Sequence, residues 1–519
     1  MATNDKGFDT ATGTDDGVVT AVQQGKGDTT RIAAKAQSAE NAPEDRVDRL
    51  GTEKIGKLIA EFAIPAIAGM FFNGLYNIID GIFMGHGVGE VGLATATVSM
   101  PIMQFSMAVS TLLGAGGNAL VALRLGEGRK EEAEKILGVC FTLGLLAAVL
   151  CTVLLNVLME PLLRLQGVND AIIESCETFI RIISFGMVLQ FLGMGFNNYI
   201  RTAGDPFRAL YTMAAGIVVS TVFNWVFVLI LKWGVAGSAW ATIMGQGTSC
   251  VLVMYYFCVS KTAPFKLRVK NMGLQTAIIG SIIALGSASF FMQIINAFLN
   301  IFVNNTIAYF GSLSPIGSGG AFAGLGVSMR AGGMTFFPIM GCAVAAQPLF
   351  GYNYGAKNYE RVKETYFTSF KWMALIGLGI FVIVEIFATN IAMIFGVKDE
   401  LLTFTSTSIR VGLSMVPIMG LQMLSANYFQ SSGQPMKSLF LSMTRQALYM
   451  LPLINILPRV LPLLFPSMSP VDGIYWSYPL ADLLAVLTSV LVIRSEFKKL
   501  DGMIAEQKEG LPEQAVLVT

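Results

Sequence analysis

Two stretches of the chain resemble each other, and they decide the architecture. Residues 198–210 read "NYIRTAGDPFRAL", and residues 427–439, an offset of 229 from the first, read "NYFQSSGQPMKSL". The same offset relates Gly167-Val168 to Gly396-Val397, Arg181 to Arg410, and Gly126 to Gly355. "FFNGLYN" (71–77) also resembles "FFMQIIN" (290–296), and "GSAW" (237–240) resembles "GIYW" (473–476). Several matches in the same order predict two similar halves.

The composition places both halves in a membrane. Of the 519 residues, 54% are hydrophobic and 13% are charged, and the mean hydropathy is +0.62. A soluble protein carries roughly a quarter charged residues. Apolar stretches of about 20 residues recur, each long enough to cross a bilayer as a helix, without the period of two that barrel strands show. The sequence therefore predicts an all-α polytopic membrane protein.

Twelve transmembrane helices can be drawn, six in each half. The first six are expected at about 57–84, 91–123, 132–158, 171–202, 206–231 and 237–260. The second six are expected at about 276–304, 320–350, 362–393, 400–431, 436–464 and 473–495. Because six is an even number, both halves have the same topology. We therefore expect two lobes related by a parallel pseudo-two-fold repeat, which is a transporter architecture.

The domain boundaries follow from these helices. We expect a disordered cytoplasmic tail at 1–54, because this stretch is polar and has no apolar core of its own. The N-terminal lobe spans 55–262 and the C-terminal lobe spans 276–497, with a cytoplasmic linker at 263–275 and a short cytoplasmic tail at 498–519.

The charges of the loops predict the orientation. One set of alternate loops carries Arg124, Arg129, Lys130, Lys135, Arg201, Arg208, Lys261, Lys266, Arg268, Lys270, Lys357, Arg361, Lys363 and Lys437. The opposite loops carry only Arg164, Lys232, Lys398 and Arg459. The positive-inside rule places the first set in the cytoplasm. A multi-pass protein of the plasma (inner) membrane is expected, with both termini cytoplasmic.

One polar stretch interrupts the first predicted helix. "NGLYNIIDGIFMG" (73–85) carries Asn73, Asn77 and Asp80 at i, i+4 and i+7, on one helix face. A carboxylate in a spanning segment costs on the order of 2.5–3.5 kcal/mol. Asp80 is either an interfacial residue that snorkels to water, or a cavity-facing group that binds H⁺ or Na⁺. The polar stripe favours the second interpretation. Burial disfavours a charged carboxylate and water favours it, so movement between the two can carry a proton.

Several motifs resemble the multidrug and toxic compound extrusion (MATE) family, over about residues 55–497. They are "LYNIIDGIFMG" (75–85), "GVAGSAWAT" (234–242), "AAQPLFGYNYGAKNYERVKE" (345–364), "RQALYMLPLINILP" (445–458) and "YPLADLL" (478–484). The chain is most similar to the prokaryotic branch that includes the DNA-damage-inducible transporters. The resemblance implies a cation-coupled antiporter that exports organic, often cationic, compounds by rocking two lobes between inward-open and outward-open states.

The resemblance also implies a coupling site. Asp80 matches the first-helix aspartate that the family uses in cation coupling, and Thr242 matches a sixth-helix threonine. The fifth helix of the family usually carries Asn and Asp four residues apart, where this chain has Ser220 and Asn224. The predicted cation-coupling residues are Asp80, Asn77, Ser220, Asn224 and Thr242. Na⁺ is a possible ligand of Asp80, Asn224 and Thr242, but one carboxylate equally suits a proton site. Ser220 and Asn224 have an alternative role in helix–helix hydrogen bonding.

Polar residues of the second half complete the predicted sites. Gln293, Asn296, Asn300 and Asn304 recur every three or four residues, and Leu299 stands at the repeat position of Asp80. The predicted substrate-cavity residues are Asn73, Gln293, Asn296, Asn300, Gln347 and Glu385, with interhelical hydrogen bonding as the alternative for the amide stripe. Arg445 and Asp482 are predicted to form a structural charge pair, since a buried charge usually has a partner. The sequence assigns no partner to Glu385.

Three classes of function differ in the residues that they need. Antiport of small organic compounds, driven by H⁺ or Na⁺ and without a further cofactor, fits all the motifs. A flippase of lipid-linked sugars needs a more cationic cavity to hold pyrophosphate, and Arg181, Arg410 and Arg445 are few basic residues for the predicted spans. An intramembrane enzyme needs a nucleophile–base pair or metal ligands, and the chain has one histidine, His86, and no HExxH motif. We therefore expect a monomeric transporter in the lipid bilayer, not an enzyme and with no nucleic-acid partner.

Overall fold

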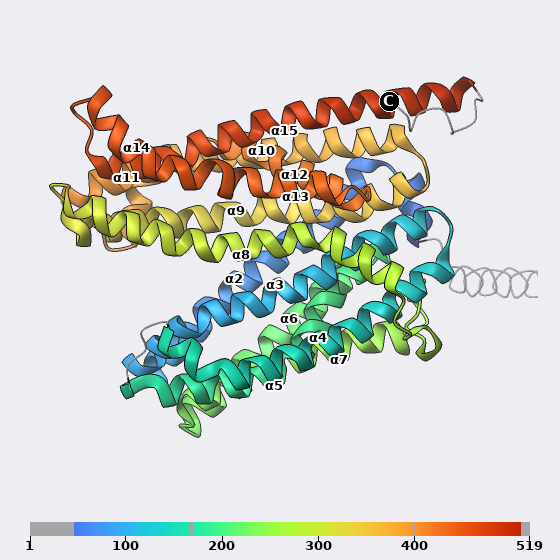
Figure 1. Ribbon diagram of the computed structural model, residues 1–519, viewed down its shortest axis with the longest axis horizontal. Helices are drawn as coiled ribbons and strands as arrows, with labels where there is room; N and C mark the ends of the chain where they lie inside the picture. Colours follow the sequence, from blue (N-terminus) through green and yellow to red (C-terminus); the bar gives the residue numbers. More distant parts are fainter. Residues whose placement is uncertain (1–45, 166–169, 399, 510–519) are drawn as a thin grey trace, which may run out of the picture.

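The structure is a computed structural model that describes residues 46–165, 170–398 and 400–509. In this part of the chain the helices form two groups, as expected (Figure 1). The N-terminal lobe contains α2 (Ile55–Gly87), α3 (Glu90–Gly126), α4 (Lys130–Leu165), α5 (Asp170–Thr202), α6 (Pro206–Asn224) with the π-helical turn η1 (Trp225–Ile230), and α7 (Gly234–Cys258).

The C-terminal lobe follows a linker that includes the short 3₁₀ turn η2 (Val269–Asn271). It contains α8 (Thr276–Ser312), α9 (Gly317–Gly355), α10 (Tyr359–Ile394), α11 (Glu400–Gly412), α12 (Val416–Ser431), α13 (Pro435–Met443), the π-helical turn η3 (Thr444–Met450), α14 (Leu451–Leu464) and α15 (Pro470–Glu509).

The number of membrane helices agrees with the prediction of twelve. Ten helical segments of the described chain are long and apolar enough to cross a bilayer, with α6–η1 and α13–η3–α14 each counting as one. The pair α11 and α12, bent by 46°, is the eleventh. The helix α7 falls below this limit of apolarity, because its 25 residues are rich in glycine and hydroxyl side chains, and it lies where the sixth span was expected.

The internal repeat is visible in the backbone and in the burial of matched residues. Gly204 and Gly433 occupy equivalent positions of the two halves, and both have φ near +80°. Only a residue without Cβ adopts this conformation without strain. Tyr199 and Tyr428 are also equivalent, and both are 0% exposed. The two halves therefore use the same turn and the same buried aromatic anchor.

The two lobes meet at one end of the molecule, called here the basic end, where the chain passes between α3 and α4, α5 and α6, α7 and α8, α9 and α10, and α12 and α13. The other end is called the open end. A Cβ atom on Gly286 of α8 would lie 1.9 Å from the carbonyl oxygen of Leu112 on α3. A Cβ atom on Gly355 of α9 would lie 2.2 Å from the carbonyl oxygen of Leu123. Backbones this close hold the lobes together at the basic end, and the helices diverge toward the open end (Figure 1, left).

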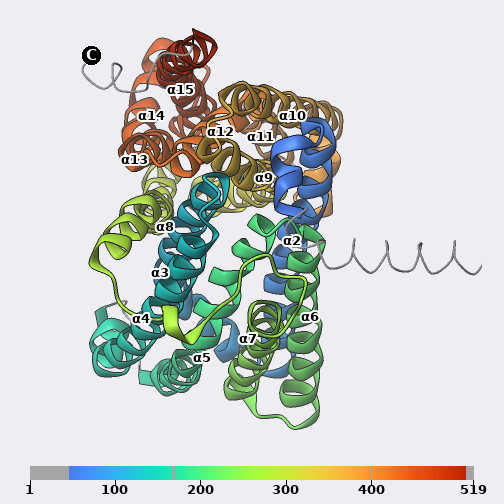
Figure 2. The same cartoon turned by 90° about the vertical axis from the view of Figure 1, so that its right-hand side faces the viewer.

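The first turns of α2 belong to the packing of the opposite lobe. Leu58 and Phe62, both 1% exposed, are buried in one cluster with Ala343, Ala346 and Phe350 of α9. Figure 2, which looks at the basic end, shows this part of α2 beside α9 and α10. In this state α2 therefore crosses from one lobe to the other along its length.

Residues 46–52 precede α2 and are helical, so they are not part of the disordered tail expected at 1–54. Arg46 forms an ion pair of 2.7 Å with Asp205 of the N-terminal lobe. Leu50 is 1% exposed and packs in the C-terminal lobe, and its carbonyl oxygen accepts a hydrogen bond of 3.0 Å from Asn353 Nδ2. This short segment therefore touches both lobes at the basic end. The remainder of the expected tail, residues 1–45, lies outside the described residues.

The expected linker and C-terminal tail are also ordered against the lobes. Phe265 of the linker is 0% exposed within the N-terminal core, and Arg268 pairs with the buried Glu134 of α4 at 3.0 Å. The last helix, α15, runs on to Glu509, well beyond the expected lobe boundary at 497. Residues 510–519 lie outside the described part.

Candidate functional site

The carboxylate of Asp80 lies inside the N-terminal lobe, where α2, α6 and α7 meet. Its Oδ1 atom accepts a hydrogen bond of 2.9 Å from the Ser238 hydroxyl and one of 3.2 Å from Asn224 Nδ2. No cation pairs with Asp80 among the described residues. The carboxylate is therefore held by neutral groups alone.

A second pair of hydroxyl groups extends the same site. The Tyr76 and Thr242 hydroxyl oxygens are 2.9 Å apart. Tyr76 precedes Asp80 by four residues on α2, and Thr242 follows Ser238 by four residues on α7. The i, i+4 spacing places the members of each pair on one helix face. Two facing helices thus present two consecutive polar layers to each other.

One buried oxygen atom at the site, Asn224 Oδ1, has no hydrogen-bond partner in the described chain, and Asn224 is 1% exposed. Ser220 Oγ, on a residue that is 2% exposed, lies beside the Tyr76 hydroxyl. A buried polar atom without a partner costs about 1–3 kcal/mol. Such an oxygen atom suits a bound cation or an added proton, which would use it as ligand or acceptor.

The backbone of α6 helps to place Asn224. The α-helix ends at Asn224, and the chain continues as the π-helical turn η1. Wider π turns inside α-helices are frequent at functional sites. Here the change of helix type begins directly after the residue that bonds Asp80.

The donor set decides which ions fit. Carboxylate, amide and hydroxyl oxygens are hard ligands that suit Na⁺, whereas transition metals favour histidine or thiolate groups. The described chain contains no cluster of three or more His, Cys, Asp or Glu residues that would hold a metal ion. Asp80, Asn224 and Thr242, with Ser220 and Ser238, are the residues that would hold Na⁺; a proton needs Asp80 and one neighbouring acceptor.

The sequence predicted four of these residues, Asp80, Ser220, Asn224 and Thr242, but not Tyr76 and Ser238. Tyr76 lies four residues before Asp80, and Ser238 lies four residues before Thr242. The i, i+4 spacing on one helix face could therefore have identified both. The side chain of Asn77, another predicted member, lies outside the described residues. Asn73 is half-buried on the face of α2 that also carries Asp80.

The structure also shows which way Asp80 points. Gly69, three turns before it on nearly the same face of α2, packs against Met213 and Leu210 of α6. The opposite face of α2, with Ile67, Phe71 and Gly74, touches α9 instead. Asp80 therefore faces the interior of the N-terminal lobe and not the space between the lobes.

The amides of α8 divide into two groups. Asn296 Oδ1 accepts a hydrogen bond of 2.6 Å from Gln446 Nε2 of η3, which joins two helices of the same lobe. Gln293 is half-buried, and Asn300 and Asn304 are exposed. Gln347 of α9 donates to Asn427 Oδ1 of α12 at 3.1 Å, again within the lobe. Contact with substrate stays a prediction for these residues.

The charged residues that the sequence analysis singled out in the C-terminal lobe lie in ion pairs. Arg445 of η3 forms an ion pair with Asp482 of α15, and its guanidinium group lies 5.7 Å from the centre of the Phe336 ring. Asp482 is 4% exposed. Glu385 of α10 lies 3.9 Å from Arg410 of α11, the partner that the sequence did not assign.

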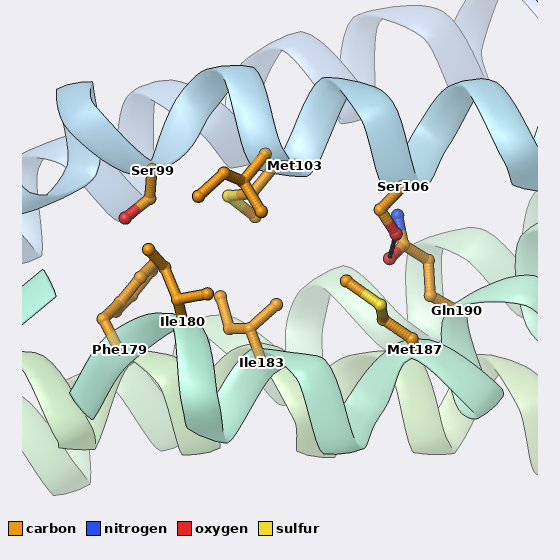
Figure 3. Close-up of a pocket in the computed structure, with 9 residues that line it drawn as sticks. Ser99, Met103, Ser106, Phe179, Ile180, Ile183, Met187 and Gln190 are labelled. Carbon is orange, nitrogen blue, oxygen red and sulfur yellow. Dashed lines mark hydrogen bonds between the residues drawn. The ribbon is translucent and has the colours of Figure 1, made fainter. Parts of the chain in front are cut away.

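A small pocket lies between α3 and α5, away from the Asp80 site (Figure 3). Apolar side chains such as Met103, Ile183 and Met187 form most of its wall, and Ser106 donates to Gln190 Oε1 at 3.1 Å across one end. The pocket has room for about one water molecule. It is a packing gap within the lobe and too small for an organic substrate.

The similarity to known proteins decides the family. The MatE family matches residues 65–226 and, a second time, residues 288–455. The chain belongs to the MatE family. The two matches fall in the two lobes, as the internal repeat requires.

Named relatives and solved structures of MatE transporters agree with this assignment. The multidrug export protein MepA of Staphylococcus haemolyticus is 19% identical over 85% of this chain and 94% of its own length. The FAD transporter of Shewanella oneidensis is 20% identical over 77% of this chain and 87% of its own length. A multidrug resistance MATE family transporter in an outward-facing conformation aligns with a TM-score of 0.79 and 23% identity, covering 88% of this chain and 98% of the other.

These findings show the general function. The chain is a multi-pass membrane transporter and not an enzyme, and it is a secondary-active exporter of drugs or other organic compounds. The flippase of lipid-linked sugars, the second function that the sequence left open, is not favoured.

Proposed function

We propose that the chain is an antiporter in which Asp80 binds the coupling ion, H⁺ or Na⁺, in exchange for an exported organic compound. The observation that carries the proposal is the Asp80 carboxylate, which within the described residues accepts bonds only from Asn224 and Ser238 and lies beside the buried, unpartnered Oδ1 atom of Asn224. A carboxylate with neutral partners can bind and release a cation without breaking an ion pair.

Either ion has a physical route. As a carboxylate, Asp80 accepts the bonds from Asn224 and Ser238. A proton adds one donor to this group, and the free oxygen of Asn224 is a nearby acceptor after side-chain rotation. Na⁺ would instead draw the oxygen atoms of Asp80, Asn224 and Thr242 toward itself. Both events pull α2, α6 and α7 together, which links ion binding to the shape of the N-terminal lobe.

We also propose that the basic end faces the cytoplasm of a cell with an inner, or plasma, membrane. Basic loops favour the cytoplasmic side, and the connections at this end carry most of the basic loop residues. The state described here would then be open to the outside. Residues 55–262 and 276–497 would move as the two lobes, and the contacts at the basic end would break when the transporter opens inward.

The named relatives support export of a broad range of organic compounds, because one is a multidrug exporter and another is an FAD transporter. The test is dye accumulation in everted vesicles under an imposed ΔpH or ΔNa⁺, with Asp80→Asn beside the native chain. Ethidium and rhodamine 6G are suitable dyes. The variant should lose accumulation under the gradient that drives the native protein, with normal insertion into the membrane.

A matched control is Glu160→Gln, an exposed carboxylate of the same lobe that pairs with Arg164. It should leave accumulation unchanged. Coupled transport by Asp80→Asn at the native rate would refute the role of Asp80. Dependence of the native rate on ΔNa⁺ alone, or on ΔpH alone, identifies the ion.

A further inference from the structure

The arginine of α9 differs from the paired arginines Arg410 and Arg445 of the same lobe. Arg330 lies on α9, is exposed, and makes no ion pair or hydrogen bond with any residue of the described chain. The sequence analysis named Arg181, Arg410 and Arg445 as basic residues of the predicted spans and did not name Arg330. By contrast, Arg410 and Arg445 lie beside Glu385 and Asp482.

Arg330 lies at membrane depth. A helix of 39 residues such as α9 is about 58 Å long, whereas the hydrocarbon core of a bilayer is about 30 Å thick. Arg330 precedes the midpoint of α9, Phe336, by six residues, which is about 9 Å along the axis. An ionisable residue at this depth almost always faces a bundle interior or a water-filled space.

The contacts of α9 show which way Arg330 points. A Cβ atom on Gly341 would lie 2.6 Å from Ile67 of α2, and Phe337 packs edge-to-face on Phe71 of α2 with ring centres 5.7 Å apart. Arg330 precedes Phe337 by seven residues and Gly341 by eleven. These spacings put all three on one helix face. Arg330 therefore continues the α2-facing side of α9 toward the open end, where the two helices have diverged (Figure 1).

The opposite side of α9 is occupied. A Cβ atom on Gly324 would lie 2.7 Å from the Phe404 ring of α11, and Gly412 of α11 lies against Ser328. Arg330 thus projects away from its own lobe, into the space between the lobes.

A second helix brings amides to the same space. Gly286 of α8 touches α3 at the basic end. Gln293, Asn300 and Asn304 follow it at i+7, i+14 and i+18, on the same helix face. Asn300 and Asn304 are exposed. The C-terminal lobe therefore presents a cation on α9 and neutral hydrogen-bonding groups on α8.

The facing side of the N-terminal lobe is apolar. On α2, Ile78 and Ile82 continue the α9-facing side and are 49% and 52% exposed. Asp80 faces the lobe interior instead. No described carboxylate on α2 is thus placed to neutralise Arg330 across the gap.

We propose that Arg330 binds an anionic group of the exported compound, so that the substrates include organic anions or zwitterions with a carboxylate, sulfonate or phosphate on an apolar body. Guanidinium groups bind these anions through two parallel hydrogen bonds. The amides of α8 then bond polar substituents, and the isoleucines of α2 contact the apolar body. This inference rests on the proposed function, because it assigns the substrate class of the same transport path.

Two dyes with one xanthene ring system provide the test: sulforhodamine B, which carries sulfonates, and cationic rhodamine 6G. Their affinities are measured by fluorescence anisotropy for the full chain in nanodiscs. Arg330→Gln should weaken binding of sulforhodamine B by about tenfold and leave rhodamine 6G unchanged, and Arg330→Lys should recover part of the loss. The control is Arg459→Gln, which removes an arginine stacked on Phe310 outside the α9 face and should change neither affinity.

Equal affinities of the native chain and Arg330→Gln for sulforhodamine B would overturn the proposal, because Arg330 would then serve only to reach the lipid headgroups. An equal loss for both dyes would also overturn it, because that would indicate a structural defect. The expected binding pattern without export of either dye under either gradient would leave the Arg330 site standing and refute the proposed antiport. The experiments can therefore refute the Arg330 site and the proposed antiport independently of each other.

Discussion

Asp80 and Asp482 lie between the membrane helices of the N-terminal and the C-terminal lobe, and the two lobes bond these carboxylates in opposite ways. Asp482 of the C-terminal lobe forms an ion pair with Arg445. Asp80 of the N-terminal lobe accepts hydrogen bonds from the neutral Asn224 and Ser238, and from no other residue of the described chain. An ion pair fixes the charge state of both members, whereas neutral partners leave a carboxylate able to bind a cation. The same scaffold thus supplies a clamp in one lobe and an ion site in the other.

The largest expected effect comes from removing the charge of the clamp. Asp482→Asn leaves Arg445 unpaired in a mostly buried position and should lower the free energy of unfolding by about 3–5 kcal/mol. Asp80→Asn should leave it unchanged or raise it, because no cation loses its partner. Thermal unfolding of the two variants in the same detergent measures both effects. An equal loss of stability in the two variants would contradict the assignment of Asp482 to a structural ion pair and of Asp80 to an ion site.

The contact of the lobes at the basic end is the next most sensitive feature. Gly286→Ala brings a methyl group against the backbone of Leu112, and overpacking of this kind costs about 1–3 kcal/mol. The variant should therefore favour states in which the two lobes are separated at the basic end. Accessibility of an introduced cysteine at Leu112 to a water-soluble thiol reagent measures this. Gly280→Ala is the matched control, because nothing lies within 4 Å of its Cβ, and it should behave as the native chain.

A smaller effect is expected from one hydrogen bond of the ion site. Ser238→Ala removes the 2.9 Å bond to Asp80, which is worth about 1 kcal/mol or somewhat more because the acceptor is charged. The ion concentration at half-maximal transport should shift about fivefold. Ser281→Ala, an exposed serine of α8, should not shift it. A native ion dependence for Ser238→Ala would remove Ser238 from the site.

The smallest effect concerns the segment at residues 46–53. Hydrogen bonds from Lys57 and Arg49 lower the pKa of Glu53 below its usual 4.5. A lowered pKa in the folded state gives stability that is complete above pH 4.5 and is lost as the pH falls through the folded value. The mobility of a spin label at residue 52, in a Cys258→Ser background, should rise in that range. Glu53→Gln should abolish most of the change, and an unchanged response would show that another group controls the segment.

The sequence predicted the fold well, because the length of an apolar helix and the presence of an internal repeat can be recognised without knowledge of tertiary contacts. The offset between "NYIRTAGDPFRAL" and "NYFQSSGQPMKSL" was sufficient for two lobes, and the turn at Gly204 and Gly433 confirms their equivalence. Asp80 was predicted for the same reason, since a carboxylate is conspicuous in an apolar span. The hydrogen bond from Ser238 to Asp80 depends instead on how α7 is rotated about its axis relative to α2. The residue pattern of a single helix does not determine this rotation.

The direction of a side chain was the harder property. Asp80 and Ile78 are two residues apart on α2, yet one faces the lobe interior and the other the space between the lobes. The same applies to Arg330, whose importance follows from the contacts of Phe337 and Gly341 on its own helix face. Which face of a helix meets which neighbour is a tertiary property, and only the packed structure supplies it.

The most direct test of the division between the lobes follows their separation as the ion changes. Spin labels at Val91 and Leu313, on opposite lobes at the open end, report the distance by double electron–electron resonance in a Cys258→Ser background. We expect the native chain and Arg330→Gln to change this distance when the pH or the Na⁺ concentration changes, and Asp80→Asn to stay in one state. A native response of Asp80→Asn, or a lost response of Arg330→Gln, would contradict the account.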